Sequence, residues 1–335
     1  MSKRLSKFAA ATAIYIAFAI YLYQPYFKHF DAWQYLLVVN TCWASLGCLV
    51  LSRRWVAAFS WSCLAGAVYG FGPLLLGFAR FHPIAGFLAG SIPWLFCPVA
   101  FIAKRKGRWL TVPLWALPFL AIFVFFQVFT HFRLFVIPIQ SKLNLADLGG
   151  LFAPLVMALQ GRTLIGFYHV PVAALMMGAL MLLAARRFGI MVVFAIGTIF
   201  AFCDSFLNIS PIIWLALPAL CGAILAGVGM QGLAGASFAD RRWVLVAAVI
   251  MTVLSTLALL LATEYFQLFA GLGVRHAKLL VQTAKMYILG AVAVAIIFFM
   301  TRAKLRIALL RWIILCSAMT ADIFLSARFI VDTIL

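Results

Sequence analysis

Residues 243–263 read WVLVAAVIMTVLSTLALLLAT, twenty-one positions without a charged side chain, between Arg241-Arg242 and Glu264. As an α-helix this stretch would be about 32 Å long, enough to cross the roughly 30 Å hydrocarbon core of a bilayer. It does not alternate between polar and apolar positions, as a strand of a membrane β-barrel would. The stretch therefore predicts a transmembrane helix.

The rest of the chain has the same character. Of 335 residues, 67% are hydrophobic and 10% are charged, whereas soluble proteins have about 45–50% apolar and about 25% charged residues. This composition excludes soluble, disordered, collagen-like and disulfide-scaffold proteins. It predicts an all-α polytopic membrane protein, with residues 1–335 forming one integral-membrane domain and no soluble domain. Eleven spans are expected, at 8–25, 33–52, 55–78, 83–103, 109–130, 164–185, 188–208, 211–231, 243–263, 279–301 and 307–330.

The basic residues predict an orientation. The chain has 26 Lys and Arg against 7 Asp and Glu, and positive charge gathers in the cytoplasmic loops of membrane proteins. With the N-terminus inside and eleven spans, 17 basic residues lie on the cytoplasmic side and 9 on the outer side. We expect a cytoplasmic N-terminus that begins an uncleaved first helix, an outer C-terminus, and a bacterial inner-membrane location. The positive charge then indicates a lipid bilayer as partner rather than nucleic acid.

The longest connection, residues 131–163, tests this orientation. Its second apolar run, 148–160, is too short to cross a bilayer. A crossing here would also move the later clusters of Arg and Lys to the outer side, against the charge rule. The segment is therefore predicted to lie at the outer leaflet as an interfacial or re-entrant element.

Three ionisable residues lie inside predicted spans: Asp204, Lys285 and Asp322. A charge in hydrocarbon costs several kcal/mol, so each needs a partner or a function. They could form an ion or proton site, or line a polar substrate cavity, in the outer half of the bundle. A structural salt bridge is the alternative. Because Lys285 and Asp322 lie at similar depths on neighbouring spans, an ion pair between them is predicted.

All five histidines fall on the predicted outer side, where most would be interfacial. His169 is the one expected to face the interior, and it joins Asp204, Asp322 and Lys285 as a binding or ion-coupling candidate. No two histidines have the i, i+3 or i+4 spacing of a metal-ligand pair on a helix, so no metal site is predicted. His82, His131, His169 and His276 remain weak candidates for metal or haem, and no cofactor is assigned.

The sequence contains no phosphate-binding loop, dinucleotide fingerprint or hydrolase elbow. The first hypothesis is a transporter or permease for a small or lipid-like substrate, driven by ion coupling or by a partner. The second is a membrane-embedded subunit of a respiratory or photosynthetic complex, with haem or quinone near the outer histidines and other membrane subunits as partners. The third is a membrane enzyme acting on a lipid-linked substrate at the outer face. The lack of a catalytic motif favours transport over catalysis, and no catalytic residue is assigned.

Overall fold

The computed structural model describes residues 2–81, 83–102, 108–132, 143–162, 164–184, 189–203, 209–263, 274–303, 305 and 307–335. Over these residues the chain forms helices joined by turns, with no strand. The predicted all-α membrane protein is confirmed at this level.

The long helices are α1 (Ser2–Tyr23), α2 (Tyr35–Ser52), α5 (Pro83–Ile102), α6 (Arg108–His131), α11 (Ala216–Gly235), α12 (Arg241–Thr263), α14 (Val274–Arg302) and α15 (Ala308–Ile334). The shorter ones are α3 (Phe59–Gly70), α4 (Pro73–Gly77), α7 (Pro154–Leu159), α8 (His169–Ala184), α9 (Gly189–Phe202) and α10 (Pro211–Trp214). Short 3₁₀ helices are η1 (Gln24–His29), η2 (Phe78–Arg80), η3 (Leu145–Leu151) and η5 (Phe238–Asp240).

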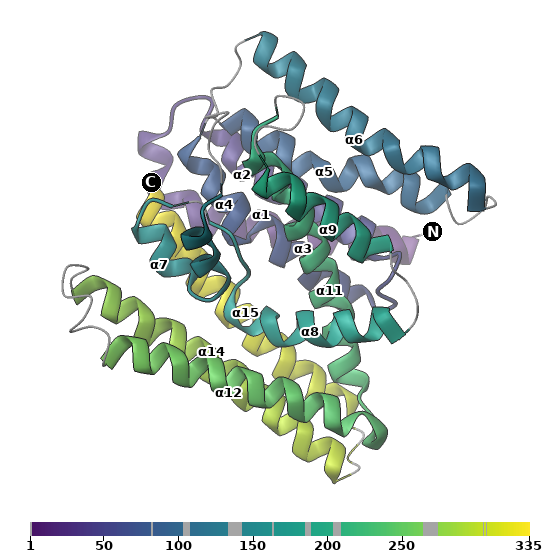
Figure 1. Cartoon of the computed structure of the whole chain (residues 1–335), viewed down its shortest axis with the longest axis vertical. Helices are drawn as coiled ribbons and strands as arrows, with labels where there is room; N and C mark the ends of the chain where they lie inside the picture. The colour runs from purple at the N-terminus through teal and green to yellow at the C-terminus, as the bar shows by residue number, and fades with distance from the viewer. Residues whose placement is uncertain are drawn as a thin grey trace.

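Helix α11 is the centre of the bundle. It packs most extensively on α8, and also on α3 and α9, while α6 lies along one edge of the molecule and α12 with α14 along the opposite edge (Figure 1). Small residues permit this central position. A Cβ atom at Gly229 of α11 would collide with the carbonyl of Ala174 on α8, so the two backbones touch there. Such contacts replace the hydrophobic effect as the packing force between membrane helices.

Glycines on α3 and α5 allow these two helices to pack closely against α2. A Cβ at Gly70 of α3 would meet Ser45 of α2, and one at Gly90 of α5 would lie 3.3 Å from the Cβ of Ala44. Both glycines belong to G-x-x-x-G motifs, Gly66–Gly70 and Gly86–Gly90. This spacing is typical of faces where membrane helices pack closely, and each of the two motifs faces α2.

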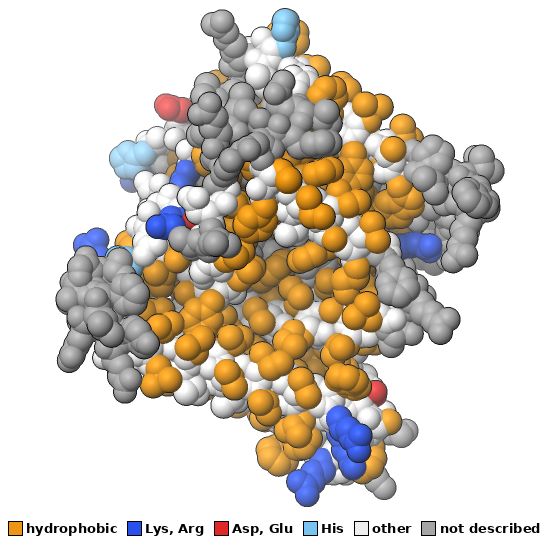
Figure 2. Space-filling view, viewed as in Figure 1, with side chains coloured by type: hydrophobic (Ala, Val, Ile, Leu, Met, Phe, Trp, Pro, Cys, Tyr) orange, Lys and Arg blue, Asp and Glu red, His pale blue; other side chains and the backbone are white. Residues whose placement is uncertain are grey.

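Nine helical segments of the described chain are long and apolar enough to cross a membrane. Hydrophobic side chains cover the middle of the face in Figure 2, and Lys and Arg lie toward its edges. The predicted spans 164–185 and 188–208 are shorter than expected, because α8 and α9 have 16 and 14 residues. At 1.5 Å per residue these helices are about 24 and 21 Å long, less than the hydrocarbon thickness.

The predicted continuous span 55–78 is broken in the structure. Helix α3 ends at Gly70, Gly72 is extended with φ −72° and ψ 158°, and α4 begins at Pro73. Proline disfavours a helical conformation in the residue before it, which explains the break at Gly72. Between α10 and α11 the chain stays helical, since Leu215 has φ −60° and ψ −23°. One helical hydrogen bond is missing there, because Pro218 has no N–H to offer the carbonyl of Trp214.

Residues 143–162 form two short helices, η3 and α7, and neither is long enough to cross a bilayer. Helix α7 packs against α14 and α15, with Leu155 and Ala158 buried. Among residues 143–162 no helix is therefore long enough for the full crossing that the sequence analysis argued against. Residues 133–142 of the same connection lie outside the described residues.

A tyrosine hydroxyl replaces the backbone hydrogen bond that α5 loses at Pro93. Proline lacks an N–H, so the carbonyl of Ala89, four residues earlier, loses its helical donor. The hydroxyl of Tyr69 on α3 donates to that carbonyl at 2.7 Å, and both groups are buried. Unsatisfied carbonyls are costly in hydrocarbon, and this hydrogen bond lets α5 continue past the proline.

Replacing Tyr69 by phenylalanine should therefore destabilise the protein by about 1–3 kcal/mol, because a buried acceptor is left without a donor. In a Pro93→Ala background the loss should be smaller, since residue 93 then supplies the missing N–H. Thermal unfolding in detergent would measure both. Tyr35→Phe is the control, as the hydroxyl of Tyr35 bonds the carbonyl of Phe27 at the exposed surface. Equal losses in the two backgrounds would contradict this account.

Candidate functional site: a buried histidine–aspartate pair

Two of the predicted site residues meet in the interior. Nδ1 of His169, the first residue of α8, lies 3.0 Å from Oδ1 of Asp322 in the middle of α15. Both side chains are 0% exposed. The prediction that His169 faces the interior is confirmed, and the structure gives it an acidic partner that the sequence did not indicate.

The chain before α8 places His169 inside the bundle. Gly166 has φ +136°, a conformation that L residues with side chains rarely adopt. A Cβ at Gly166 would collide with the carbonyl of Gly150, so this segment runs directly against η3. Two residues later the buried hydroxyl of Tyr168 donates to the carbonyl of Phe71, at the break between α3 and α4, at 2.6 Å. Helix α8 therefore begins in the protein interior rather than at the surface.

A helix that begins in the interior needs acceptors for its first N–H groups. Oδ2 of Asp322 accepts the backbone N–H of Val170 at 2.6 Å, and Oδ1 accepts the hydroxyl of Ser326 at 3.1 Å. A carboxylate at this position also interacts favourably with the positive end of the helix dipole. Asp322 thus serves as the acceptor for the start of α8.

The donors around Asp322 favour one tautomer of the imidazole. An ionised carboxylate is an acceptor only, so a neutral His169 paired with it donates through Nδ1. In that tautomer the other ring nitrogen, Nε2, has a free lone pair. Nε2 is buried and has no hydrogen-bond partner among the residues that the structure describes. The carboxylate of Asp322 thus orients the ring and leaves Nε2 free to bind another group.

Aromatic side chains enclose the imidazole. The ring of Tyr287 on α14 lies edge to face with it, with the centroids 4.9 Å apart and the planes at 85°. The hydroxyl of Tyr287 donates to the carbonyl of Phe152, 2.8 Å away. The Tyr287 and Tyr168 hydroxyls thus each donate to a backbone carbonyl, and the site is closed to water in this conformation.

The predicted ion pair between Lys285 and Asp322 is wrong. Lys285 is exposed, and the salt bridges among described residues pair Asp322 with His169 instead. The two residues do lie on packed helices, α14 and α15. The prediction matched the depths of the two residues but not their rotation about the helix axes, and Lys285 lies on an exposed face of α14.

The remaining candidates do not join this site. Asp204 and His82 lie outside the described residues. His131 is exposed at the end of α6, and His276 is half-buried near the start of α14. No group of three or more His, Cys, Asp or Glu side chains that could hold a metal occurs in the described part of the chain.

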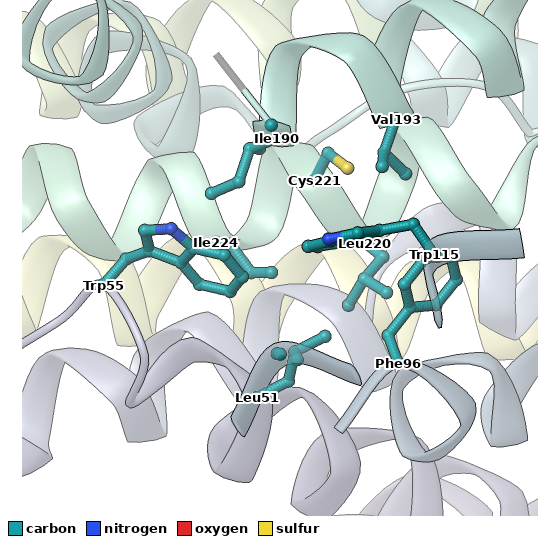
Figure 3. A pocket seen from close by; sticks show the side chains of 11 residues that line it. Leu51, Trp55, Phe96, Trp115, Ile190, Val193, Leu220, Cys221 and Ile224 are labelled. Atoms are coloured by element: carbon teal, nitrogen blue, oxygen red, sulfur yellow. The ribbon is translucent and has the colours of Figure 1, made fainter. Parts of the chain in front are cut away.

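The cavities near the bundle centre and at its surface differ in kind. An apolar void of about 20 Å³ lies between Leu51, Trp55, Phe96, Trp115 and Cys221 (Figure 3). It has room for about one water molecule but offers no set of polar partners to hold it. A much larger groove lies between α1, α3 and α15.

Comparisons with protein-family models, with curated proteins and with solved structures give no match to this chain. The site is therefore interpreted from its own geometry. Sequence reasoning missed Ser326, Tyr287 and the N–H of Val170. The i, i+4 spacing of Asp322 and Ser326 was a visible signal for the first. The other two depend on where α8 begins, which no local pattern shows.

The hydrogen bonds at Asp322 predict a ranking of variants. Asp322→Asn should lower the free energy of unfolding by about 1.5–3 kcal/mol, because the hydrogen bonds here involve a charged acceptor. Ser326→Ala should cost about 1 kcal/mol, and Lys285→Met should leave stability unchanged. Denaturation in detergent measures all three. A loss of stability for Lys285→Met as large as that for Asp322→Asn would contradict this account and would indicate an ion pair between Lys285 and Asp322.

Proposed function

We propose that this protein is a multi-pass transporter for a lipid-like substrate, coupled to protons through His169 and Asp322. The observation that carries the proposal is the buried Nε2 of His169, which has no hydrogen-bond partner in the described chain. Most buried polar atoms in proteins are paired, and Nε2 of His169 is one of a small set of unpaired ones in the described chain, a set that also includes both ring nitrogens of His276. His169 differs from His276 because a buried carboxylate orients its ring. A purely structural cap for α8 would need Asp322 but not a second, unsatisfied ring nitrogen.

Proton binding suits this nitrogen. Imidazole gains and loses a proton near neutral pH, and it is a common proton carrier in pumps and transporters. Protonation of Nε2 would place a positive ring beside the Asp322 carboxylate in a dry interior. The new donor would also need an acceptor, which supplies a driving force for rearranging α8 and α15.

Two further features support transport. The break at Gly72 interrupts the apolar segment Phe59–Arg80. Discontinuous helices of this kind are typical of transporters, where the break lies beside the path of the substrate or ion. The groove between α1, α3 and α15 is lined mainly by apolar side chains, as a site for a lipid would be.

For the topology we propose a cytoplasmic N-terminus and an odd number of crossings. Eleven crossings follow if α8 and α9 cross as shorter helices within the bundle. The bias of Lys and Arg supports this orientation and a bacterial inner-membrane location. The segment containing η3 and α7 would then enter from the outer side without crossing.

Single-cysteine labelling in a cysteine-free background tests the topology. Arg105→Cys and Arg187→Cys should react with a membrane-impermeant maleimide only after the cytoplasmic face is opened. Asn144→Cys should react from the periplasmic side in intact spheroplasts. Labelling of position 105 from the periplasmic side, or protection of position 144 from that side, would contradict the proposed orientation.

Proton coupling is tested with two matched variants of His169. Asparagine can keep a donor near the Nδ1 position but has no atom at Nε2, whereas glutamine can place its amide near Nε2. We expect wild-type proteoliposomes to translocate a fluorescent anionic lipid faster when a pH gradient is imposed. His169→Asn should fold normally and lose the response to the gradient, and His169→Gln should lose it together with part of its stability.

Dithionite quenching of the lipid's nitrobenzoxadiazole group reports which leaflet the lipid occupies. The matched control is Lys285→Met, which removes an exposed charge on the neighbouring helix. If His169→Asn keeps the full response to the gradient, the pair does not couple protons to transport.

A further inference from the structure

The groove between α1, α3 and α15 is long and largely apolar. It has a volume of about 1030 Å³ and is lined along its length by Ala10, Ile14, Ala17, Leu64, Ile323 and Phe324. The hydroxyl of Tyr15 lies at its floor and donates to the carbonyl of Cys63 at 2.6 Å. That bond satisfies the polar group at the floor. The groove therefore offers its occupant mainly apolar surface.

The length of the groove is informative. Its α1 side extends from Lys7 to Tyr21, about 21 Å along a helix. One leaflet of the hydrocarbon core is about 15 Å thick. An ordinary acyl chain that starts at one membrane surface would end near the midplane, leaving the far third of the groove empty. A longer chain fills it.

The two ends of the groove differ in charge. At one end the ammonium of Lys7 is exposed and makes no ion pair with any residue that the structure describes, and Trp312 lines the same end. Near the other end, Arg328 is already paired with Asp332 at 3.0 Å and donates to the carbonyl of Tyr21. An anionic headgroup is therefore attracted to the Lys7 end.

The same contacts fix the shape of the groove. The hydroxyl of Tyr26 in η1 donates to Asp332 at 2.7 Å, and Arg328 donates to the carbonyl of Tyr21 at 3.2 Å, so the end of α1 and the η1 turn are held against α15. Phe18 and Tyr21 of α1 also stack on Phe324 of α15. These contacts close the groove at its Arg328 end.

We propose that this groove binds the single long polyprenyl chain of a lipid phosphate, with the phosphate at Lys7 and the chain end near Tyr21. The inference rests on the proposed function and names its substrate class. Each observation contributes one property: the apolar lining selects a hydrocarbon, the length selects a chain longer than a leaflet, and the unpaired ammonium selects an anion.

Equilibrium binding in detergent tests this without any gradient or translocation. The probe is a fluorescent long-chain polyprenyl phosphate, displaced by the unlabelled compound, by geranyl phosphate, by the matching polyprenol and by dioleoyl phosphatidic acid. The long-chain phosphate should compete best. The short phosphate, the alcohol and the two-chain lipid should each be weaker by at least about tenfold, equivalent to about 1.4 kcal/mol.

Two alanines on α1 provide a matched pair of variants. Ala17 lines the groove, and Ala13 is equally exposed but does not. Ala17→Phe should weaken binding of the long-chain phosphate at least about tenfold, and Ala13→Phe should leave it unchanged. Lys7→Gln should weaken the phosphate but not the alcohol.

Three results would overturn the inference: equal binding by Ala17→Phe and Ala13→Phe, equal competition by phosphatidic acid, or no effect of Lys7→Gln. The second would mean that the groove holds ordinary bilayer lipid only. Proton-driven translocation of another lipid, measured separately, could still stand. Conversely, tight binding without any response to a pH gradient would remove the transport proposal and keep the binding site.

Discussion

A backbone amide or carbonyl in hydrocarbon has no water to bond, so every helix end or break inside a membrane protein needs a polar side chain nearby. This chain has several such points. Tyrosine hydroxyls donate to the carbonyls of Ala89, Phe71 and Phe152. Arg80 donates to the carbonyl of Ala158 in the last turn of α7 and to that of Arg162 just after the helix. Most of the buried polar side chains in the described chain form a hydrogen bond with a backbone group, which accounts for their presence in the interior.

Asp322 belongs to this set and also differs from it. It satisfies the N–H of Val170, as the rule requires, but it is a carboxylate where an amide or hydroxyl oxygen would also accept. Its second oxygen holds His169. A neutral imidazole costs less to bury than the ammonium of Lys285, because removing a charge from water is the larger penalty. This explains why Asp322 pairs with histidine while the lysine stays exposed.

The limits of sequence reasoning here have physical causes. Hydrophobic runs locate the helices well, because twenty apolar residues in a row have few alternatives to a membrane. Asp322 and His169 could also be recognised individually from the sequence, because each is a polar residue in an apolar segment. Their pairing was not, because it depends on α8 starting in the interior after Gly166, more than 150 residues before Asp322. The rejected Lys285 pair shows the error: depth follows from counting residues, whereas rotation about the helix axis follows from packing.

Helix α15 connects the two sites. One of its faces carries Asp322 and Ser326 toward α8, and another lines the groove through Cys316, Thr320 and Ile323. Ile323 follows Asp322 directly, so a rotation of α15 that separates the carboxylate from His169 must also move the groove wall. Coupling between two sites requires an element with two arrangements that both sites can bias. Protonation of His169 would act on one face of this helix and a bound chain on the other. The two events would then alter each other's equilibrium by the same factor, since linkage between binding sites is reciprocal.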